Sequence, residues 1–321
     1  MGAAPARIPV TVIGGYLGAG KTTLVNHLLR NAAGRRIAIL VNDFGALPID
    51  ADLIEAQDDD LISIAGGCVC CSFGSDLMGA LAKLAQRTPA PDHLLIETSG
   101  VALPGGVARS VALLAAFSID GVAVVTDAET VRARTADPYM GDTITRQLAE
   151  ADLVIVNKTD LVTPDSHADL HMWMAQAAPR ARVVEAVRGR IPPEILFGGF
   201  ELDSMRAGTG LLSTGNLRPI EDASARYASA SFELPDAVDV ERLARALADP
   251  ACGLIRAKGV LRDLDGTLKA LHLVGARFEV TPFAGRGPTG LACIGLRDRF
   301  DQAAIERIAG LSNAAIFSKT P

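Results

Sequence analysis

The sequence predicts an α/β fold in which a mainly parallel, doubly wound sheet is followed by a smaller α+β domain with an antiparallel sheet. Three observations support this class. Short apolar runs alternate with longer helical patterns over residues 1–190, which is typical of parallel strands joined by crossover helices. After residue 226 the pattern changes to strands joined by short turns. The 321 residues are also enough for two domains of ordinary size.

Seven apolar runs are the strand candidates of the first domain, which we assign to residues 1–197. They are almost continuously apolar, as expected for strands that helices cover on both faces. The runs are residues 9–13, 37–41, 61–64, 94–96, 122–125, 153–156 and 182–185.

Residues 198–226 show no sustained hydrophobic periodicity and contain several glycines and isolated prolines. We therefore predict a linker there. Residues 227–321 form the predicted second domain, in which short turns such as Asp265-Gly266 favour an antiparallel sheet. Its expected elements are a strand at 228–234, a helix at 238–247, strands near 253–262, 267–274, 277–282 and 291–296, and a helix at 302–311.

Composition and charge exclude several classes of protein. Hydrophobic residues make up 49% of the chain and charged residues 21%, which excludes a disordered chain. The net charge is −6 and no large cluster of Lys and Arg is present, which disfavours a nucleic-acid partner. The longest apolar stretch, residues 107–125, is interrupted by Arg109 and Asp120, so no membrane span is predicted. Without an apolar signal segment, a cytoplasmic location and reduced thiols are expected.

A phosphate-binding pattern follows the first predicted strand. Residues 15–22 match G-x-x-x-x-G-K-[ST] and precede a predicted helix at 23–30. Backbone N–H groups of such a loop surround the β-phosphate, Lys21 reaches the β- and γ-oxygens, and the Thr22 hydroxyl holds Mg²⁺. A merely structural turn has no use for this Lys-Thr pair. We expect Lys21 to be an exposed loop residue. The predicted nucleotide-binding residues are Gly15, Gly18, Ala19, Gly20, Lys21, Thr22 and Thr23.

A second motif, Asn157-Lys158-Thr159-Asp160, follows the apolar run 153–156, at the edge where a doubly wound sheet binds its ligand. The Asp160 carboxylate can accept from guanine N1–H and from the exocyclic amine, whereas adenine offers no such pair of donors. Alone, the motif also fits a surface turn. Together with the phosphate loop, Asn157, Lys158 and Asp160 predict a GTPase.

Glu97 ends the apolar run 94–96 and precedes Thr98-Ser99-Gly100, an arrangement suited to the Mg²⁺ water shell and the γ-phosphate. We predict that Glu97 acts with Lys21 and Thr22 in catalysis; the alternative is a helix cap. No glutamine follows Gly100 to orient water, and no arginine finger is evident. Intrinsic hydrolysis is therefore expected to be slow.

Three thiols, Cys68, Cys70 and Cys71, lie within four residues and can converge on one soft ion such as Zn²⁺, Co²⁺ or Cu⁺. The alternative is a set of small buried side chains. Isolated Cys252 and Cys293 are interpreted as core residues. His167 and His171 share a helix face, which we interpret as an exposed surface.

These motifs, in this order, resemble the CobW family of GTP-dependent metallochaperones over nearly the whole chain. The resemblance is carried by residues 14–24, 41–45, 68–71, 97–100 and 157–161, and by 254–259 and 271–275 near the C-terminus. It implies that Cys68, Cys70 and Cys71 bind the delivered metal and that Asp50 lies near the γ-phosphate with Mg²⁺. Asp43 stands where the family usually has glutamate.

The leading hypothesis is a carrier that uses GTP and Mg²⁺ to load Zn²⁺ or Co²⁺. It would deliver the ion to a client metalloprotein or a metal-cofactor biosynthesis enzyme. The alternative is a GTP-dependent switch or assembly factor with a structural thiol site. A small-molecule kinase is disfavoured by the guanine motif.

Overall fold

The computed structural model describes residues 7–32, 34–42, 61–64, 76–198, 226–234, 236–285 and 289–310. The chain divides into two compact units, Met1–Phe197 and Gly198–Pro321. Of the segment predicted to be a linker, only Gly198 and Arg226 are among the described residues. Within these ranges no helix combines the length and the apolar character needed to cross a bilayer.

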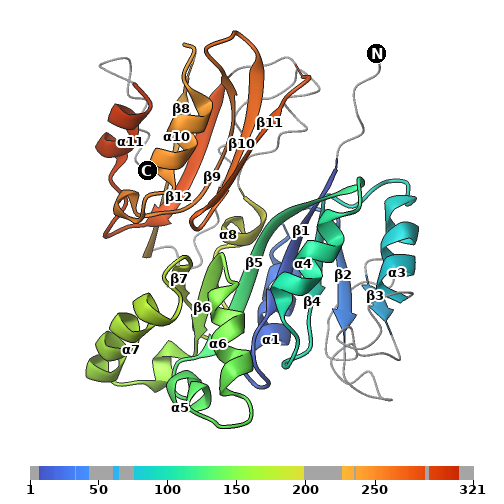
Figure 1. The fold of residues 1–321 in the computed structure, drawn as a ribbon, viewed down its shortest axis with the longest axis vertical. Helices are drawn as coiled ribbons and strands as arrows, with labels where there is room; N and C mark the ends of the chain where they lie inside the picture. The colour runs from blue at the N-terminus through green and yellow to red at the C-terminus, as the bar shows by residue number, and fades with distance from the viewer. Residues whose placement is uncertain are drawn as a thin grey trace. The chain divides into compact units, whose positions relative to one another are not determined.

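The first unit is built on a seven-stranded sheet with the order β3-β2-β4-β1-β5-β6-β7 (Figure 1). All neighbouring strands in it run parallel. Each of the seven predicted runs forms a strand, so the predicted parallel sheet is confirmed. The strands are β1 (Ile8–Gly14), β2 (Ile37–Asn42), β3 (Leu61–Ile64), β4 (His93–Glu97), β5 (Phe117–Asp127), β6 (Leu153–Asn157) and β7 (Arg182–Glu185).

Helices cover both faces of this sheet because most strand residues are apolar on both sides. Leu94 and Ile96 of β4 join a buried cluster with residues of α3, α4, α6 and α7. Leu95 points to the opposite face and is equally buried, and α1 packs against β4. The helices are α1 (Lys21–Arg30), α3 (Asp76–Ala85), α4 (Pro104–Ala112), α5 (Val131–Thr135), α6 (Gly141–Ala149), α7 (Pro164–Ala177) and α8 (Glu194–Phe197).

Strand β5 is longer than the predicted run 122–125, because it begins before the polar Asp120. This carboxylate is buried, and its Oδ2 lies 4.0 Å from Nε2 of His93 on β4. The same imidazole nitrogen is 2.9 Å from Oγ1 of Thr11 on β1. Buried polar groups are tolerated where they have such partners. The periodicity of the sequence cannot reveal those partners, because they lie on other strands.

The strand order determines where a ligand can bind. Strand β1 lies between β4 and β5, and the chain crosses from one side of β1 to the other, which creates a topological switch point. The parallel strands present their carboxyl ends at one edge. In the register of the sheet Ile13 pairs with Glu97, and Asp127 pairs with Asn157. The loops that follow β1, β4, β5 and β6 therefore open beside one another.

The second unit contains a five-stranded antiparallel sheet in the order β11-β10-β9-β12-β8, which confirms the predicted α+β class. Helix α10 packs against this sheet and contributes Val240, Leu243 and Leu247 to its core. The elements are β8 (Tyr227–Glu233), α10 (Val240–Leu247), β9 (Leu254–Arg262), β10 (Leu268–Val274), β11 (Arg277–Pro282), β12 (Gly290–Leu296) and α11 (Gln302–Ile308).

Cys252 and Cys293 are reduced thiols buried in this unit. Burial, with a smaller contribution from Cys252, raises the pKa of the Cys293 thiol. A thiol that stays protonated is a poor metal ligand, because metals bind the thiolate. Both cysteines therefore belong to the hydrophobic core.

Candidate nucleotide site

The phosphate-binding pattern forms the loop between β1 and α1. Gly15, Gly18 and Gly20 have φ angles of 130°, 76° and 103°, a backbone conformation that other residues rarely adopt. Helix α1 begins at Lys21, two residues before the predicted start. Its N-cap is Gly20, which has no side chain to satisfy the first N–H groups of the helix. A helix start of this kind is suited to an anion such as phosphate.

Lys21 is buried, with 8% of its surface exposed, so the expectation of an exposed loop lysine was wrong. The reason is the early start of α1, because Lys21 shares the buried face of that helix with Leu24, Val25 and Leu28. Thr23, the last predicted residue of the phosphate loop, is exposed at the same helix start.

The side chains of Thr22 and Glu97 meet at this edge of the sheet. Thr22 Oγ1 donates to Glu97 Oε1 over 3.0 Å, and Glu97 is 2% exposed at the end of β4. A hydroxyl and a carboxylate are hard oxygen donors of the kind that Mg²⁺ prefers. Burial makes a carboxylate costly unless it has a partner or a cation. The pair therefore fits a magnesium site.

The loop after β4 packs against the phosphate loop. A Cβ atom added to Gly100 would lie 2.7 Å from the backbone nitrogen of Leu17. Gln147 of α6, which is 1% exposed, donates from Nε2 to the carbonyls of Gly100 and Ala102 over 3.1 and 2.7 Å. Sequence reasoning missed Gln147, although a glutamine on the apolar face of a helix is a signal for such a buried contact.

The guanine motif is tied to the phosphate loop by the side chain of Asn157. Its Nδ2 donates to the Ala19 carbonyl over 2.9 Å, and its Oδ1 accepts from the Gly189 backbone over 2.8 Å. Asn157 is buried, and both ends of its amide are used by the protein. Its geometry is that of a positioning residue between the two loops.

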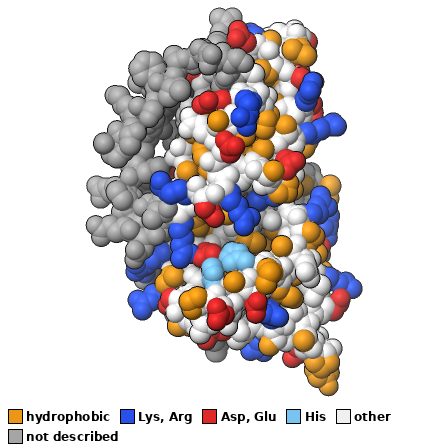
Figure 2. Space-filling view, turned by 90° about the vertical axis from the view of Figure 1, so that its left-hand side faces the viewer, with side chains coloured by type: hydrophobic (Ala, Val, Ile, Leu, Met, Phe, Trp, Pro, Cys, Tyr) orange, Lys and Arg blue, Asp and Glu red, His pale blue; other side chains and the backbone are white. Residues whose placement is uncertain are grey.

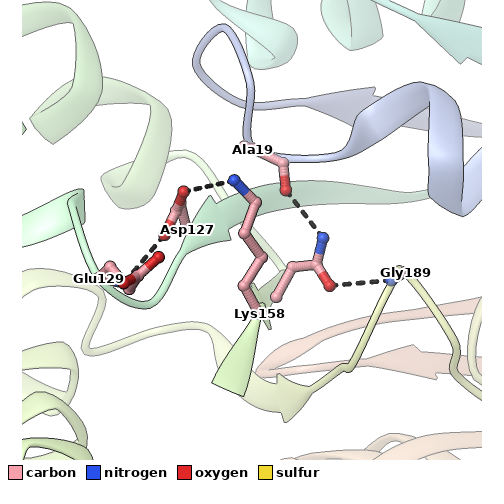
Figure 3. Close-up of polar contacts among 6 residues, drawn as sticks. Ala19, Asp127, Glu129, Lys158 and Gly189 are labelled. Atoms are coloured by element: carbon pink, nitrogen blue, oxygen red, sulfur yellow. Dashed lines mark hydrogen bonds and ion pairs between the residues drawn. The ribbon is translucent and has the colours of Figure 1, made fainter. Parts of the chain in front are cut away.

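The other residues of the motif are less buried than Asn157. Lys158 has a positive φ of 63° and its Nζ lies 2.6 Å from Oδ2 of Asp127, at the end of β5 (Figure 3). Asp160 is exposed, which leaves its carboxylate accessible to a base. Asp127 was not predicted from the sequence. The pairing of β5 with β6 brings it beside the motif, and the sequence alone does not reveal this pairing.

His27 fixes the far end of α1. Its Nε2 donates to the Ile191 carbonyl over 2.8 Å, while Asn31 Nδ2 lies 3.3 Å from its Nδ1. This arrangement suits the neutral ring, in which Nδ1 accepts. Burial lowers the pKa of His27 below 6.5, with smaller contributions from Arg190 and Arg30, and the bond to Ile191 opposes this shift.

We expect His27 to make folding stability depend on pH. Because its pKa is lower in the folded than in the unfolded state, the unfolded chain binds more protons below about pH 6.5. Stability should therefore fall as the pH decreases from 6.5 towards the folded pKa. Denaturant titrations at pH 7.5 and 5.5 should show a smaller loss for His27→Gln, which keeps a donor for Ile191. Parallel losses in both proteins would contradict the assignment.

Several predicted residues lie outside the described part of the chain, namely Asp43, Asp50, Cys68, Cys70 and Cys71. His167 and His171, interpreted as an exposed helix surface, lie at the surface but are less exposed than expected. Both rings are half-buried against Glu185 on β7, because β7 runs beside α7.

The chain is similar to several known proteins. A sequence model of the CobW/HypB/UreG nucleotide-binding domain matches residues 9–185. The zinc chaperone CobW of Sinorhizobium sp is 32% identical over 294 residues, which cover 81% of this chain and 79% of that protein. The zinc chaperone YjiA of Escherichia coli K12 is 32% identical over 286 residues, or 84% and 86% of the two chains. The crystal structure of Zn(II)-bound YjiA GTPase gives a TM-score of 0.45 at 24% identity over 96% of this chain and 100% of that chain.

Proposed function

This chain belongs to the CobW/HypB/UreG family, and from that premise we propose that its GTPase cycle drives the delivery of zinc to a client. The client would be a metalloprotein or an enzyme of metal-cofactor biosynthesis. The contact between Thr22 and Glu97 is the observation that best supports the GTP-hydrolysis part of this proposal, because it joins the phosphate loop to the carboxyl end of β4. The names of the relatives support zinc as the cargo.

The residues of the first unit divide the work of nucleotide binding. The N–H groups at the start of α1 would hold the phosphates, and Lys21 would place its ammonium group against the β- and γ-oxygens. The exposed Asp160 would bind guanine. Asn157 would hold the loop after β6 in place against the phosphate loop through its hydrogen bond to Ala19. GTP is preferred to ATP because adenine would leave the Asp160 carboxylate without donors.

Thr22 and Glu97 would hold Mg²⁺. Asp50, which is not among the described residues, is the third proposed Mg²⁺ residue. When bound, the ion supplies positive charge that offsets the negative charge on the transferred phosphoryl group. Lys21 adds charge to the same oxygens. No glutamine follows Gly100 to orient the attacking water, which supports a slow intrinsic rate.

Cys68, Cys70 and Cys71 are the proposed ligands of the cargo ion. Thiolates bind Zn²⁺ and Co²⁺ well, and three of them leave one coordination position for a fourth ligand or for the client. These cysteines follow β3, whose order in the sheet is β3-β2-β4-β1. Parallel pairing brings the carboxyl end of β3, the strand that precedes the cysteines in the sequence, to the same edge as Glu97 and the end of β1, and this supports the proposal.

The experiment that tests this proposal is a zinc titration in two nucleotide states under reducing conditions. If the γ-phosphate favours the metal-binding arrangement, Zn²⁺ should bind roughly 5- to 150-fold more tightly with a non-hydrolysable GTP analogue than with GDP. Cys70→Ala or Cys71→Ala should remove this difference and leave GTP binding intact. The buried Cys293 is the matched control, so Cys293→Ala should retain the difference.

Equal zinc affinity in the two states would refute the carrier, because a ligand that binds both states equally shifts neither. If zinc also could not be removed without unfolding, the alternative of a GTP switch with structural thiols would be supported instead. ATP in place of the GTP analogue should produce no difference.

A further inference from the structure

Three side chains that the nucleotide site does not use meet at the surface of the first unit. His167 Nε2 and His171 Nε2 lie 3.0 and 2.6 Å from the same oxygen, Glu185 Oε1. The two rings are 4.7 Å apart between centroids. The ligand atoms of all three residues lie within 4.8 Å of one another. Figure 2 shows histidine side chains gathered on the surface beside an acidic side chain.

The spacing of these residues is set by rigid elements. His167 and His171 are four residues apart on α7, so they lie on one face of that helix, one turn apart. Leu170 and Met174 anchor the helix in the core, and Thr163 caps its start by accepting from Ser166 N. Glu185 is the last residue of β7, which pairs with β6. A group of ligands held by packed elements loses little freedom when it binds an ion.

Two imidazoles and one carboxylate are a known donor set for zinc with an open fourth position. Zn–N and Zn–O bonds of about 2.0–2.2 Å place neighbouring ligand atoms of a tetrahedral site roughly 3.3–3.5 Å apart. The observed 2.6 and 3.0 Å contacts therefore need to open only slightly. The histidine side chains are 31% and 38% exposed, which permits this movement and gives water access to the fourth position.

We propose that His167, His171 and Glu185 form a second transition-metal site, separate from the cysteines, that takes a borderline divalent ion such as Zn²⁺ or Co²⁺. Nitrogen and oxygen donors are harder than three thiolates, so this site should reject Cu⁺, which soft thiolate ligands select. The alternative is a hydrogen-bonded cluster that only fastens α7 to β7. The two ideas differ in whether the chain binds a metal when its clustered thiols are removed.

The test uses tag-free, full-length protein carrying Cys68→Ser, Cys70→Ser and Cys71→Ser. We expect this variant to bind one Zn²⁺ per chain, and to bind Co²⁺ with ligand-field bands but without a thiolate charge-transfer band. Adding His171→Gln or Glu185→Gln should weaken binding at least about tenfold. Asp169→Asn is the matched control, because it removes an exposed carboxylate from α7 between the two histidines and should leave affinity unchanged.

The proposal fails if the protein lacking Cys68, Cys70 and Cys71 binds no zinc, or if its affinity is the same with and without His171 and Glu185. Cooperative melting and GDP binding establish that each variant is folded. If one variant does not fold, His167→Gln provides the same test from the preceding turn of α7. The three clustered cysteines are absent from every variant, so the outcome does not depend on the proposed coupling between GTP and the thiol site.

Discussion

Replacing Lys21 by alanine should reduce the rate of GTP hydrolysis by at least about 100-fold, as expected when one donor that stabilises transition-state charge is removed. Lys21 is the first residue of α1, and Gly20 at the N-cap gives the first N–H groups of that helix no side-chain partner. No other residue of the phosphate-binding pattern is cationic. The loss should be measured as kcat/KM for GTP with phosphate release as the readout.

The buried position of Lys21 makes a stability control necessary. Removal of its side chain from the face shared with Leu24 and Leu28 should cost some folding free energy, although the sheet itself is untouched. Lys83→Ala on α3 is the matched control, since it removes an exposed cation distant in sequence from the loop and should keep full activity. A folded Lys21→Ala protein with the parental rate would show that the loop is not the catalytic phosphate site.

Much of the fold follows from local patterns. The runs at β2, β4 and β6 are short and apolar on both faces, and the segments between them are long enough for a crossover, so a parallel sheet is the natural solution. The ends of helices and strands are harder to predict from the sequence. Periodicity located the start of α1 at residue 23, but the left-handed Gly20 lets the helix begin at Lys21.

The candidate site was only partly predictable, because the sequence specifies ligands better than their supports. Lys21, Thr22 and Asp160 stand in motifs whose spacing reflects their chemistry. Asp127 and Gln147 act through partners on other elements, and these contacts exist only once β5 pairs with β6 and α6 packs on the sheet. The same is true of the cluster that Glu185 forms with the two histidines of α7, since nothing in the sequence shows that β7 lies beside that helix.

Gly15→Ala should destabilise the first unit by about 3 kcal/mol or more, the largest effect on stability that we expect from a single methyl group. Gly15 has a φ of 130°, which is strained for any other residue. In addition, its new Cβ would overlap the carbonyl oxygen of Val125 on β5. Strain and overpacking each cost roughly 1–3 kcal/mol. Val125 lies on β5 at the centre of the sheet, and Gly15 directly follows β1. Neither β1 nor β5 can therefore move away without disturbing the strands beside it.

Gly18→Ala separates the two causes, since Gly18 also has a positive φ of 76° but no atom of the described residues lies within 4 Å of its added Cβ. We expect roughly 1 kcal/mol for this variant, which is the cost of strain alone. At about 2–4 °C per kcal/mol for a unit of this size, the melting temperatures should fall by about 10 °C for Gly15→Ala and by about 3 °C for Gly18→Ala. Melting without nucleotide is the appropriate measurement, because phosphate binding to the loop would add its own stabilisation. Equal shifts for the two variants would mean that β5 yields to the new methyl group and that the close approach of the loop to Val125 does not constrain this position.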